Sequence, residues 1–180
     1  MGVEIEAKLK VDSLEQIEQR LGELDCEFVE EQLHTDHFFD GRGSLLTRTD
    51  RGLRLRRQIT AEGERYFLTY KGAKEKGPYK KRREIEIEIQ GPDSARELLS
   101  ELGFKEILVF EKRRRVWRFG GCEVALDHLS SLGSFVEIEG PDEEGIAEVQ
   151  KNLGLGDLPH IPHSYASMVY KQMCEEESGS

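Results

Sequence analysis

Residues 3–10 read Val-Glu-Ile-Glu-Ala-Lys-Leu-Lys, which is a strict alternation of apolar and charged side chains. Successive side chains of a β-strand point to opposite faces, so Val3 and the other apolar residues share one face of this segment. Glu4, Glu6 and Lys8 share the other face. The pattern therefore predicts a strand that is buried on one side and presents two carboxylates and an amine on the other.

The same period of two recurs in seven more segments, and turn sequences such as Gly120-Gly121 connect neighbours as hairpins. The predicted strands are 3–10, 34–40, 52–59, 65–71, 79–90, 107–119, 122–128 and 134–139. Four amphipathic helices are expected at the connections, beginning at Ser13 or Asp12, near Asp93, near Asp142 and at Ser164. The class is α+β, with a largely antiparallel sheet whose apolar faces are covered by the helices.

Like charges are grouped on the bare faces of several predicted strands. The groups are Arg54 with Arg56, Glu84 with Glu86 and Glu88, and Glu137 with Glu139. A solvated sheet face explains one such strand, but it gains little from this grouping, because mixed signs would attract each other. Carboxylates are ligands that Mg²⁺ and Mn²⁺ prefer, and Arg and Lys bind phosphate oxygens. If the sheet curls with its charged face inside, a metal-bound polyphosphate would supply both opposite charges.

Composition narrows the class of protein. The 180 residues fit a single domain over residues 1–174, followed by a predicted disordered tail at 175–180. No apolar run reaches the roughly 20 residues of a membrane span, and no signal peptide is visible. Three cysteines in no metal spacing are typical of a cytoplasmic protein. A net charge of −10 argues against broad binding to duplex nucleic acid. The basic residues are nevertheless clustered, at Arg54 to Arg57, Lys80 to Arg83 and Lys112 to Arg115, and this clustering favours a compact anionic ligand.

Six blocks in order resemble the signature of the CYTH family, the triphosphate tunnel metalloenzymes. The blocks are Glu4-x-Glu6-x-Lys8, Leu53-Arg54-Leu55-Arg56, Thr69-Tyr70-Lys71-Gly72, Lys80-x-Arg82-x-Glu84-x-Glu86, Lys112-x-Arg114, and Leu126-Asp127-His128-Leu129 through Gly133-x-Phe135-Val136-Glu137-Ile138-Glu139. The resemblance implies a closed eight-stranded antiparallel β-barrel with helices packed on the outside and a tunnel that binds triphosphate and Mg²⁺ or Mn²⁺. Segments 34–41 and 127–133 are most similar to the class IV adenylyl cyclase branch of the family.

The resemblance also assigns residues. It implies metal ligands at Glu4, Glu6, Asp127, Glu137 and Glu139. It implies substrate binding by Lys8, Arg54, Arg56, Lys71, Lys80, Arg82, Lys112 and Arg114, with Glu84 and Glu86 orienting these bases or joining a second metal shell. The residues implied in catalysis are Glu4, Glu6, Lys8, Arg54, Arg56, Lys112 and Arg114. Some triphosphatases of the family bring a lysine from the C-terminal helix into the tunnel; here Ser164-Tyr165-Ala166 stands at about that place, with Lys171 further along, and the role stays unassigned.

Three functions remain open at this stage. The leading hypothesis is a metal-dependent adenylyl cyclase that converts ATP to 3′,5′-cyclic AMP and pyrophosphate. The second is a triphosphatase that hydrolyses tripolyphosphate, thiamine triphosphate or a nucleoside triphosphate. The third is a non-catalytic module that binds polyphosphate or RNA 5′ ends. A homodimer formed through an outer face of the barrel is a further expectation from the family resemblance.

Overall fold

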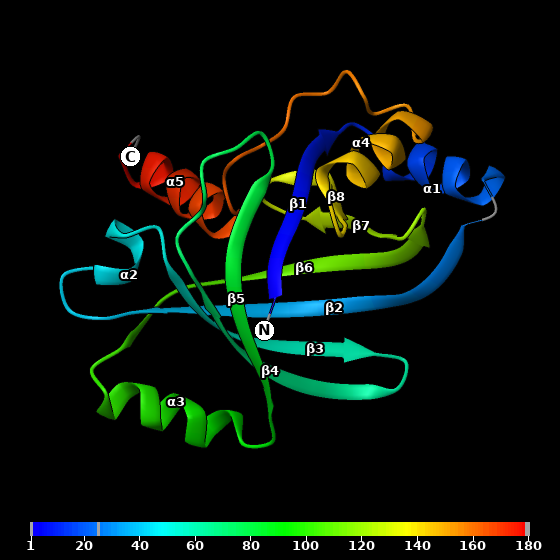
Figure 1. The fold of residues 1–180 in the computed structure, drawn as a ribbon. Helices are drawn as coiled ribbons and strands as arrows, with labels where there is room; N and C mark the ends of the chain where they lie inside the picture. The colour runs from blue at the N-terminus through cyan, green and yellow to red at the C-terminus, as the bar shows by residue number, and fades with distance from the viewer. Residues whose placement is uncertain (1, 25, 179–180) are drawn as a thin grey trace.

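The computed structural model describes residues 2–24 and 26–178, and the side chains within 5–24 and 26–176. The elements follow one another as strands joined by short helices (Figure 1). In chain order they are β1 (Gly2–Val11), α1 (Leu14–Glu23), β2 (Glu27–Asp40), α2 (Leu45–Arg48), β3 (Gly52–Thr60), β4 (Gly63–Lys71), β5 (Lys80–Ile89), α3 (Pro92–Glu101), β6 (Lys105–Phe119), β7 (Cys122–Leu129), β8 (Gly133–Glu139), α4 (Glu143–Asn152) and α5 (Tyr165–Ser178).

The eight strands form an antiparallel sheet that is arranged as a ring. The order around the ring is β1-β5-β4-β3-β2-β6-β7-β8, and β8 pairs with β1 again. Each of these strands therefore has a hydrogen-bonded neighbour on both sides, which removes the exposed edges that invite aggregation. The predicted α+β class and the antiparallel pairing are confirmed.

Three helices cover the outer face of the ring, as the alternation predicts. Leu21 of α1 and Ile146 of α4 are fully buried, and they pack in one cluster with Val124, Val136 and Ile138 of β7 and β8. Figure 1 shows α1 and α4 side by side over these strands, and α3 at the opposite end of the molecule. The burial of α3 is carried by a second cluster that contains Leu99, Leu55 and Phe39.

Helix α5 is placed differently from the prediction that all helices cover the apolar outer faces. Its Tyr165 and Val169 pack in a cluster with Leu129 and Phe135. By alternation Phe135 lies on the same face of β8 as Glu137, so the start of α5 fills one end of the ring interior. The physical reason is that the interior face is apolar at this end and needs cover.

Three element predictions differ from the structure in extent. Strand β2 begins at Glu27 rather than at 34, because it pairs with β6 along almost its whole length. Helix α2 was not predicted, since its four residues are too short to show a helical period. Residues 175–178, expected to belong to a disordered tail, continue α5. The pairs Lys171–Glu175 and Gln172–Glu176, at the i, i+4 spacing, support that last turn.

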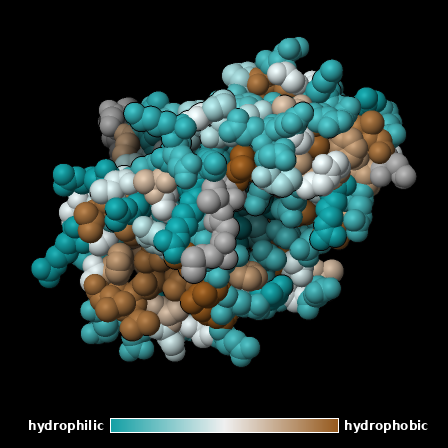
Figure 2. Space-filling model, in the orientation of Figure 1, coloured by the Kyte–Doolittle hydropathy of each residue, from teal (hydrophilic) through white to brown (hydrophobic). Residues whose placement is uncertain are grey.

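A gathering of apolar side chains lies at the lower left of Figure 2, where Figure 1 draws α3. Leu98 of α3 and Leu102, which directly follows the helix, are among the exposed large hydrophobic residues. The expected homodimer stays a prediction. No helix of the described residues is long and apolar enough to cross a membrane.

Asp40, the last residue of β2, organises the loop that contains α2. Its Oδ1 accepts the backbone N–H groups of Gly41 and Leu46 at 2.7 and 2.9 Å. Its Oδ2 accepts the N–H and the hydroxyl of Thr47 at 2.9 and 2.6 Å. Burial raises the pKa of Asp40, but these hydrogen bonds outweigh burial and hold the pKa below its usual value. Asp40 therefore stabilises the fold in its ionised form.

Asp40→Asn should lower the free energy of unfolding at pH 7 by about 1–3 kcal/mol, because an amide cannot accept all four bonds. Urea unfolding measures this difference. Protons bind the unfolded chain before the folded one, so the difference should shrink as the pH falls below about 4. Asp157→Asn, at an exposed carboxylate, is the control and should change stability by less than about 0.5 kcal/mol. A pH-independent loss would contradict the role of the charge.

Candidate active site

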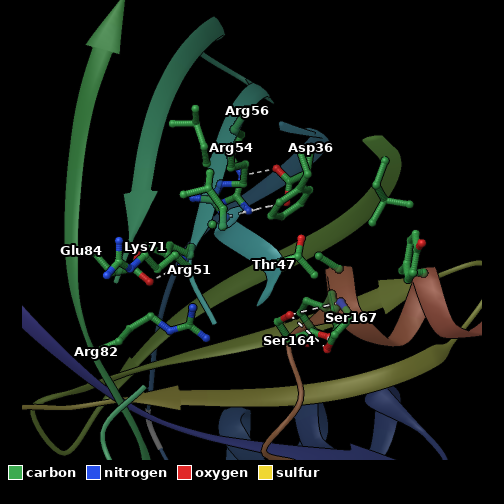
Figure 3. A pocket seen from close by; sticks show the side chains of 18 of the residues that line it. Asp36, Thr47, Arg51, Arg54, Arg56, Lys71, Arg82, Glu84, Ser164 and Ser167 are labelled. Carbon is green, nitrogen blue, oxygen red and sulfur yellow. Dashed lines mark hydrogen bonds and ion pairs between the residues drawn. The ribbon is translucent and has the colours of Figure 1, made fainter. Parts of the chain in front are cut away.

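A cavity of about 670 Å³ lies inside the ring and opens between α2 and α5. Its charged lining comes from β1 to β6 and from β8, and Figure 3 shows part of it, from β2 to β5. The predicted site residues that line it are Glu6, Lys8, Arg54, Arg56, Lys71, Lys80, Arg82, Glu84, Glu86, Lys112, Arg114, Glu137 and Glu139. Glu4 lies opposite Arg82 in the β1–β5 pairing, and its side chain is outside the described part of the chain.

The arginines of β3 are held by a carboxylate that sequence reasoning did not assign to the site. Asp36 of β2 lies directly opposite Arg56 and accepts its Nε and Nη2 at 2.6 and 2.8 Å. Arg54 Nη1 is 3.8 Å from the same carboxylate. Burial raises the pKa of Asp36, but the two guanidinium charges outweigh burial and hold the pKa well below its usual value. Asp36 is therefore an ionised partner that fixes both arginines (Figure 3).

A second ladder of contacts runs across β3, β4 and β5. Arg54 Nη2 donates to Thr69 Oγ1 at 3.1 Å and to Glu86 at 3.3 Å, and the Thr69 hydroxyl donates to Glu86 at 2.7 Å. Lys71 and Glu84 are directly opposite each other and form an ion pair. These contacts support the prediction that Glu84 and Glu86 orient the basic residues. The register of the strands places Glu84 directly beside Lys71, and it places Thr69 between Glu86 and Arg54.

Two buried guanidinium nitrogens lack a partner among the described residues. They are the Nε atoms of Arg54 and Arg82, whose side chains line the cavity. Arg82 is only 5% exposed, and Figure 3 shows its guanidinium pointing into the cavity. Buried polar groups are nearly always hydrogen-bonded in folded proteins. An anionic ligand in the cavity would accept hydrogen bonds from these cationic donors.

Asp127 was expected among the metal ligands, and the structure gives it another environment. It is fully buried behind the cavity and accepts Lys112 at 3.1 Å and Tyr165 OH at 2.9 Å. It also accepts Arg114 Nε at 2.7 Å and Arg114 Nη2 at 2.6 Å. With both oxygens engaged in this way, Asp127 is a partner of Lys112 and Arg114. The pKa of Lys112 is lowered to about 7, first by its burial and then by the charge of Arg114.

The carboxylates of β1 and β8 supply the best candidate metal ligands. Glu6 and Glu139 occupy directly opposed positions, and the next opposed pair on the same face of the sheet is Lys8 with Glu137. Directly opposed side chains have Cβ atoms about 4.5–5.5 Å apart, so two acids placed in this way repel each other. A divalent cation with its preference for oxygen ligands would relieve that repulsion. The donor set of Glu6, Glu137 and Glu139 therefore fits Mg²⁺ or Mn²⁺.

The candidate ligands are held by bases in the structure. Glu6 pairs with Lys80, and Glu137 pairs with Lys8 at 3.2 Å and with Arg114. No three acidic, histidine or cysteine side chains of the described residues gather around one point. Mg²⁺ is commonly bound through one or two carboxylates together with phosphate oxygens of the substrate and water. A three-carboxylate cage is therefore not required for the donor set to serve.

The other half of the cavity is apolar and aromatic, and sequence reasoning missed it. Phe38 and Phe110 stack with ring centroids 5.7 Å apart and planes 15° apart. Leu46 of α2 and Tyr170 of α5 line the same half. Figure 3 places Ser164 and Ser167, at the start of α5, at the edge of this space. The cavity thus combines a charged lining with an apolar, aromatic one.

A signal for part of this lining exists in the sequence. Phe38 follows Asp36 by two residues and Phe110 precedes Lys112 by two, so each shares the inward face with a charged neighbour. The sequence gives no such signal for Tyr165, because α5 is distant along the chain from the strands that it contacts. Lys171, left unassigned by the sequence, has a side chain that is 78% exposed and pairs with Glu175 at 3.7 Å outside the cavity.

Known proteins share this fold and parts of this sequence. The chain is 32% identical over 137 residues to a Methanocaldococcus jannaschii protein named "Putative adenylate cyclase MJ0240". The aligned region covers 76% of each of the two chains. It is 27% identical to "Adenylate cyclase CyaB" of Aeromonas hydrophila, over 75% of this chain and 67% of that protein.

Among solved structures, the PH1819 protein of Pyrococcus horikoshii is 31% identical, with a TM-score of 0.82 over 94% of this chain and 99% of that one. The HpAC1 protein of Hippeastrum, described as having a dominant triphosphatase activity, is 20% identical, with a TM-score of 0.73 over 94% and 96% of the two chains. At that identity the likeness supports the fold alone. The CYTH domain model matches residues 2–165, and the chain therefore belongs to the CYTH family.

Proposed function

We propose that the protein is a divalent-metal-dependent enzyme that converts ATP to 3′,5′-cyclic AMP and pyrophosphate. The observation that carries the proposal is the two-part cavity, in which buried bases and acids adjoin an apolar, aromatic half. The charged half alone would serve inorganic tripolyphosphate. The apolar half favours a substrate with an organic group, such as a nucleotide. The two curated relatives named as adenylate cyclases support the same reading.

The bases would hold the triphosphate through charge-assisted hydrogen bonds. Arg54 and Arg56 are fixed from one side by Asp36, and Lys112 and Arg114 from the other by Asp127. Donors that are already oriented cost no reorganisation when negative charge develops, which is how preorganised sites accelerate a reaction. Planar guanidinium groups suit the paired oxygens of phosphate. These residues would stabilise the pyrophosphate as it leaves.

In the proposed reaction the ribose 3′-oxygen bonds to the α-phosphorus, and the bond from that phosphorus to the bridging α–β oxygen breaks. The 3′-hydroxyl loses its proton, and the electron pair of the broken bond leaves with pyrophosphate. Glu6 and Glu139, with Glu137 beside them, would hold Mg²⁺ or Mn²⁺. A bound divalent metal would lower the pKa of the attacking hydroxyl and neutralise phosphate charge.

Incubation of the protein with ATP and Mn²⁺ or Mg²⁺ should yield cyclic AMP and pyrophosphate in equal amounts, measured by liquid chromatography. Tripolyphosphate and thiamine triphosphate are the parallel substrates. Orthophosphate from any of the three, without cyclic AMP from ATP, would make the protein a triphosphatase. Tight binding of tripolyphosphate with no product under any divalent metal would make it a binding module. Both results would overturn the cyclase proposal.

Glu6→Gln should reduce metal-dependent turnover on the order of 100-fold, because it removes a charged ligand while keeping the shape of the side chain. Titration of the protein with Mn²⁺ should show a parallel loss of metal affinity. Glu88→Gln is the matched control: Glu88 alternates onto the same face as Glu84 and Glu86, but pairs with Arg65 away from the cavity. Wild-type metal affinity in Glu6→Gln would remove Glu6 from the metal site.

A further inference from the structure

Tyr165, the first residue of α5, joins two lysines from different strands. Its side chain belongs to a buried cluster, with its ring edge-to-face against Phe135 at 5.2 Å. Lys8 Nζ of β1 lies 3.7 Å from the centroid of the Tyr165 ring, and Lys112 Nζ of β6 lies 5.1 Å from it. Both distances fall within the roughly 6 Å over which a cation is attracted to the face of an aromatic ring.

Both lysines are buried, and each already has one carboxylate partner, Glu137 at 3.2 Å for Lys8 and Asp127 at 3.1 Å for Lys112, to which the ring adds a second stabilising contact. Lys8 is 2% exposed and Lys112 is 4% exposed. The π-face of an aromatic ring offers negative potential without adding a carboxylate that would compete with phosphate for the lysine.

The hydroxyl of Tyr165 acts on the same pair of strands through Asp127. It donates to Asp127 Oδ2 at 2.9 Å, the oxygen that also accepts Lys112 at 3.1 Å. Tyr165 thereby orients the carboxylate that orients Lys112. Burial, followed by the charge of Asp127, raises the pKa of Tyr165 well above its usual value, so the hydroxyl keeps its proton to donate.

The chain that leads into α5 holds Lys8 as well. Lys8 Nζ donates to the carbonyl of His163 at 3.1 Å, and the carbonyl of Lys8 accepts the N–H of Ile161 at 2.8 Å. Segment 161–165 thus makes three contacts with Lys8. The Tyr165 ring faces its ammonium group, the His163 carbonyl accepts a hydrogen bond from that group, and the Ile161 N–H donates to its backbone carbonyl. Sequence separation from Lys8 is more than 150 residues, so only the closed fold brings these groups together.

We propose that Tyr165 is a positioning residue for the substrate triphosphate. Its ring face and its hydroxyl hold the ammonium groups of Lys8 and Lys112 at the cavity wall, where both meet the phosphates. This inference rests on the proposed function in one respect, that these lysines bind the triphosphate. Tyr165 itself makes no step of the reaction.

The test is the affinity for tripolyphosphate with Mg²⁺, measured by calorimetry, which is independent of turnover. Tyr165→Leu should weaken binding about tenfold to 30-fold through the loss of the ring face. Tyr165→Phe keeps the ring and should weaken binding only about threefold. Phe28→Leu is the control, since it removes an edge-to-face contact with Trp117 at the far end of β2 and should leave affinity unchanged.

A double-mutant cycle separates positioning from general structural support. In a Lys8→Met background, Tyr165→Leu should have an effect of about threefold or less, because the nearer cation is gone. Equal effects of Tyr165→Leu with and without Lys8 would overturn the inference. Thermal unfolding verifies that each variant is folded, and Tyr165→Met, which keeps the apolar volume, replaces a leucine variant that does not fold.

The two proposals fail in distinguishable ways. Absence of tripolyphosphate binding to the wild-type protein would refute triphosphate recognition, and with it both proposals. Wild-type binding that is unchanged in folded Tyr165→Leu would refute only the role of Tyr165. A full Tyr165 effect together with orthophosphate as the product would uphold that role and overturn the cyclase.

Discussion

The structure depends on the pairing of opposite charges across neighbouring strands inside the ring. An unpaired ion in such a place costs several kcal/mol, so each buried base requires an acid within reach. The antiparallel register provides it: Asp36 faces Arg56, Glu84 faces Lys71, and Asp127 faces Arg114. A shift of one residue in any of these pairings would turn the charged side chains outward and the apolar ones inward. The fold and the site therefore depend on the same hydrogen-bonded strand pairings.

The paired interior is also suited to exchange partners with a ligand. Asp127 is buried outside the cavity lining and holds Lys112 and Arg114 from behind, whereas Asp36, Glu6, Glu84, Glu86 and Glu137 line the cavity together with the bases they touch. In the proposed function a triphosphate would take over cavity-side contacts of the bases while the contacts with Asp127 remain. The acids released from the bases would then be available to a divalent cation. The same geometry thus stabilises the free protein and presents donors in the places where phosphate needs them.

Helix α5 completes the interior from a distant part of the chain. Its first turn covers the apolar end of the ring with Tyr165 and Val169 and places aromatic surface beside Lys8 and Lys112. The β2–β3 loop, held by Asp40, lies across the opening from it (Figure 3). The charged lining of the cavity therefore comes mainly from strands, whereas its apolar lining combines Phe38 of β2 and Phe110 of β6 with Leu46 of α2 and Tyr170 of α5. That division matches a ligand with a polyanionic end and a flat apolar end.

The sequence by itself determined the eight strands, the sorting of their faces and the charged side chains that share the interior. Alternation reports which residues lie on one side of a strand, and that is local information. It did not determine the role of Asp127 or the position of α5. It also did not identify Asp36 as the charge partner of Arg54 and Arg56. These depend on which strands become neighbours around the ring and on where a distant helix packs. Only the tertiary structure decided them, because a charge partner and an aromatic ring act through distance in space.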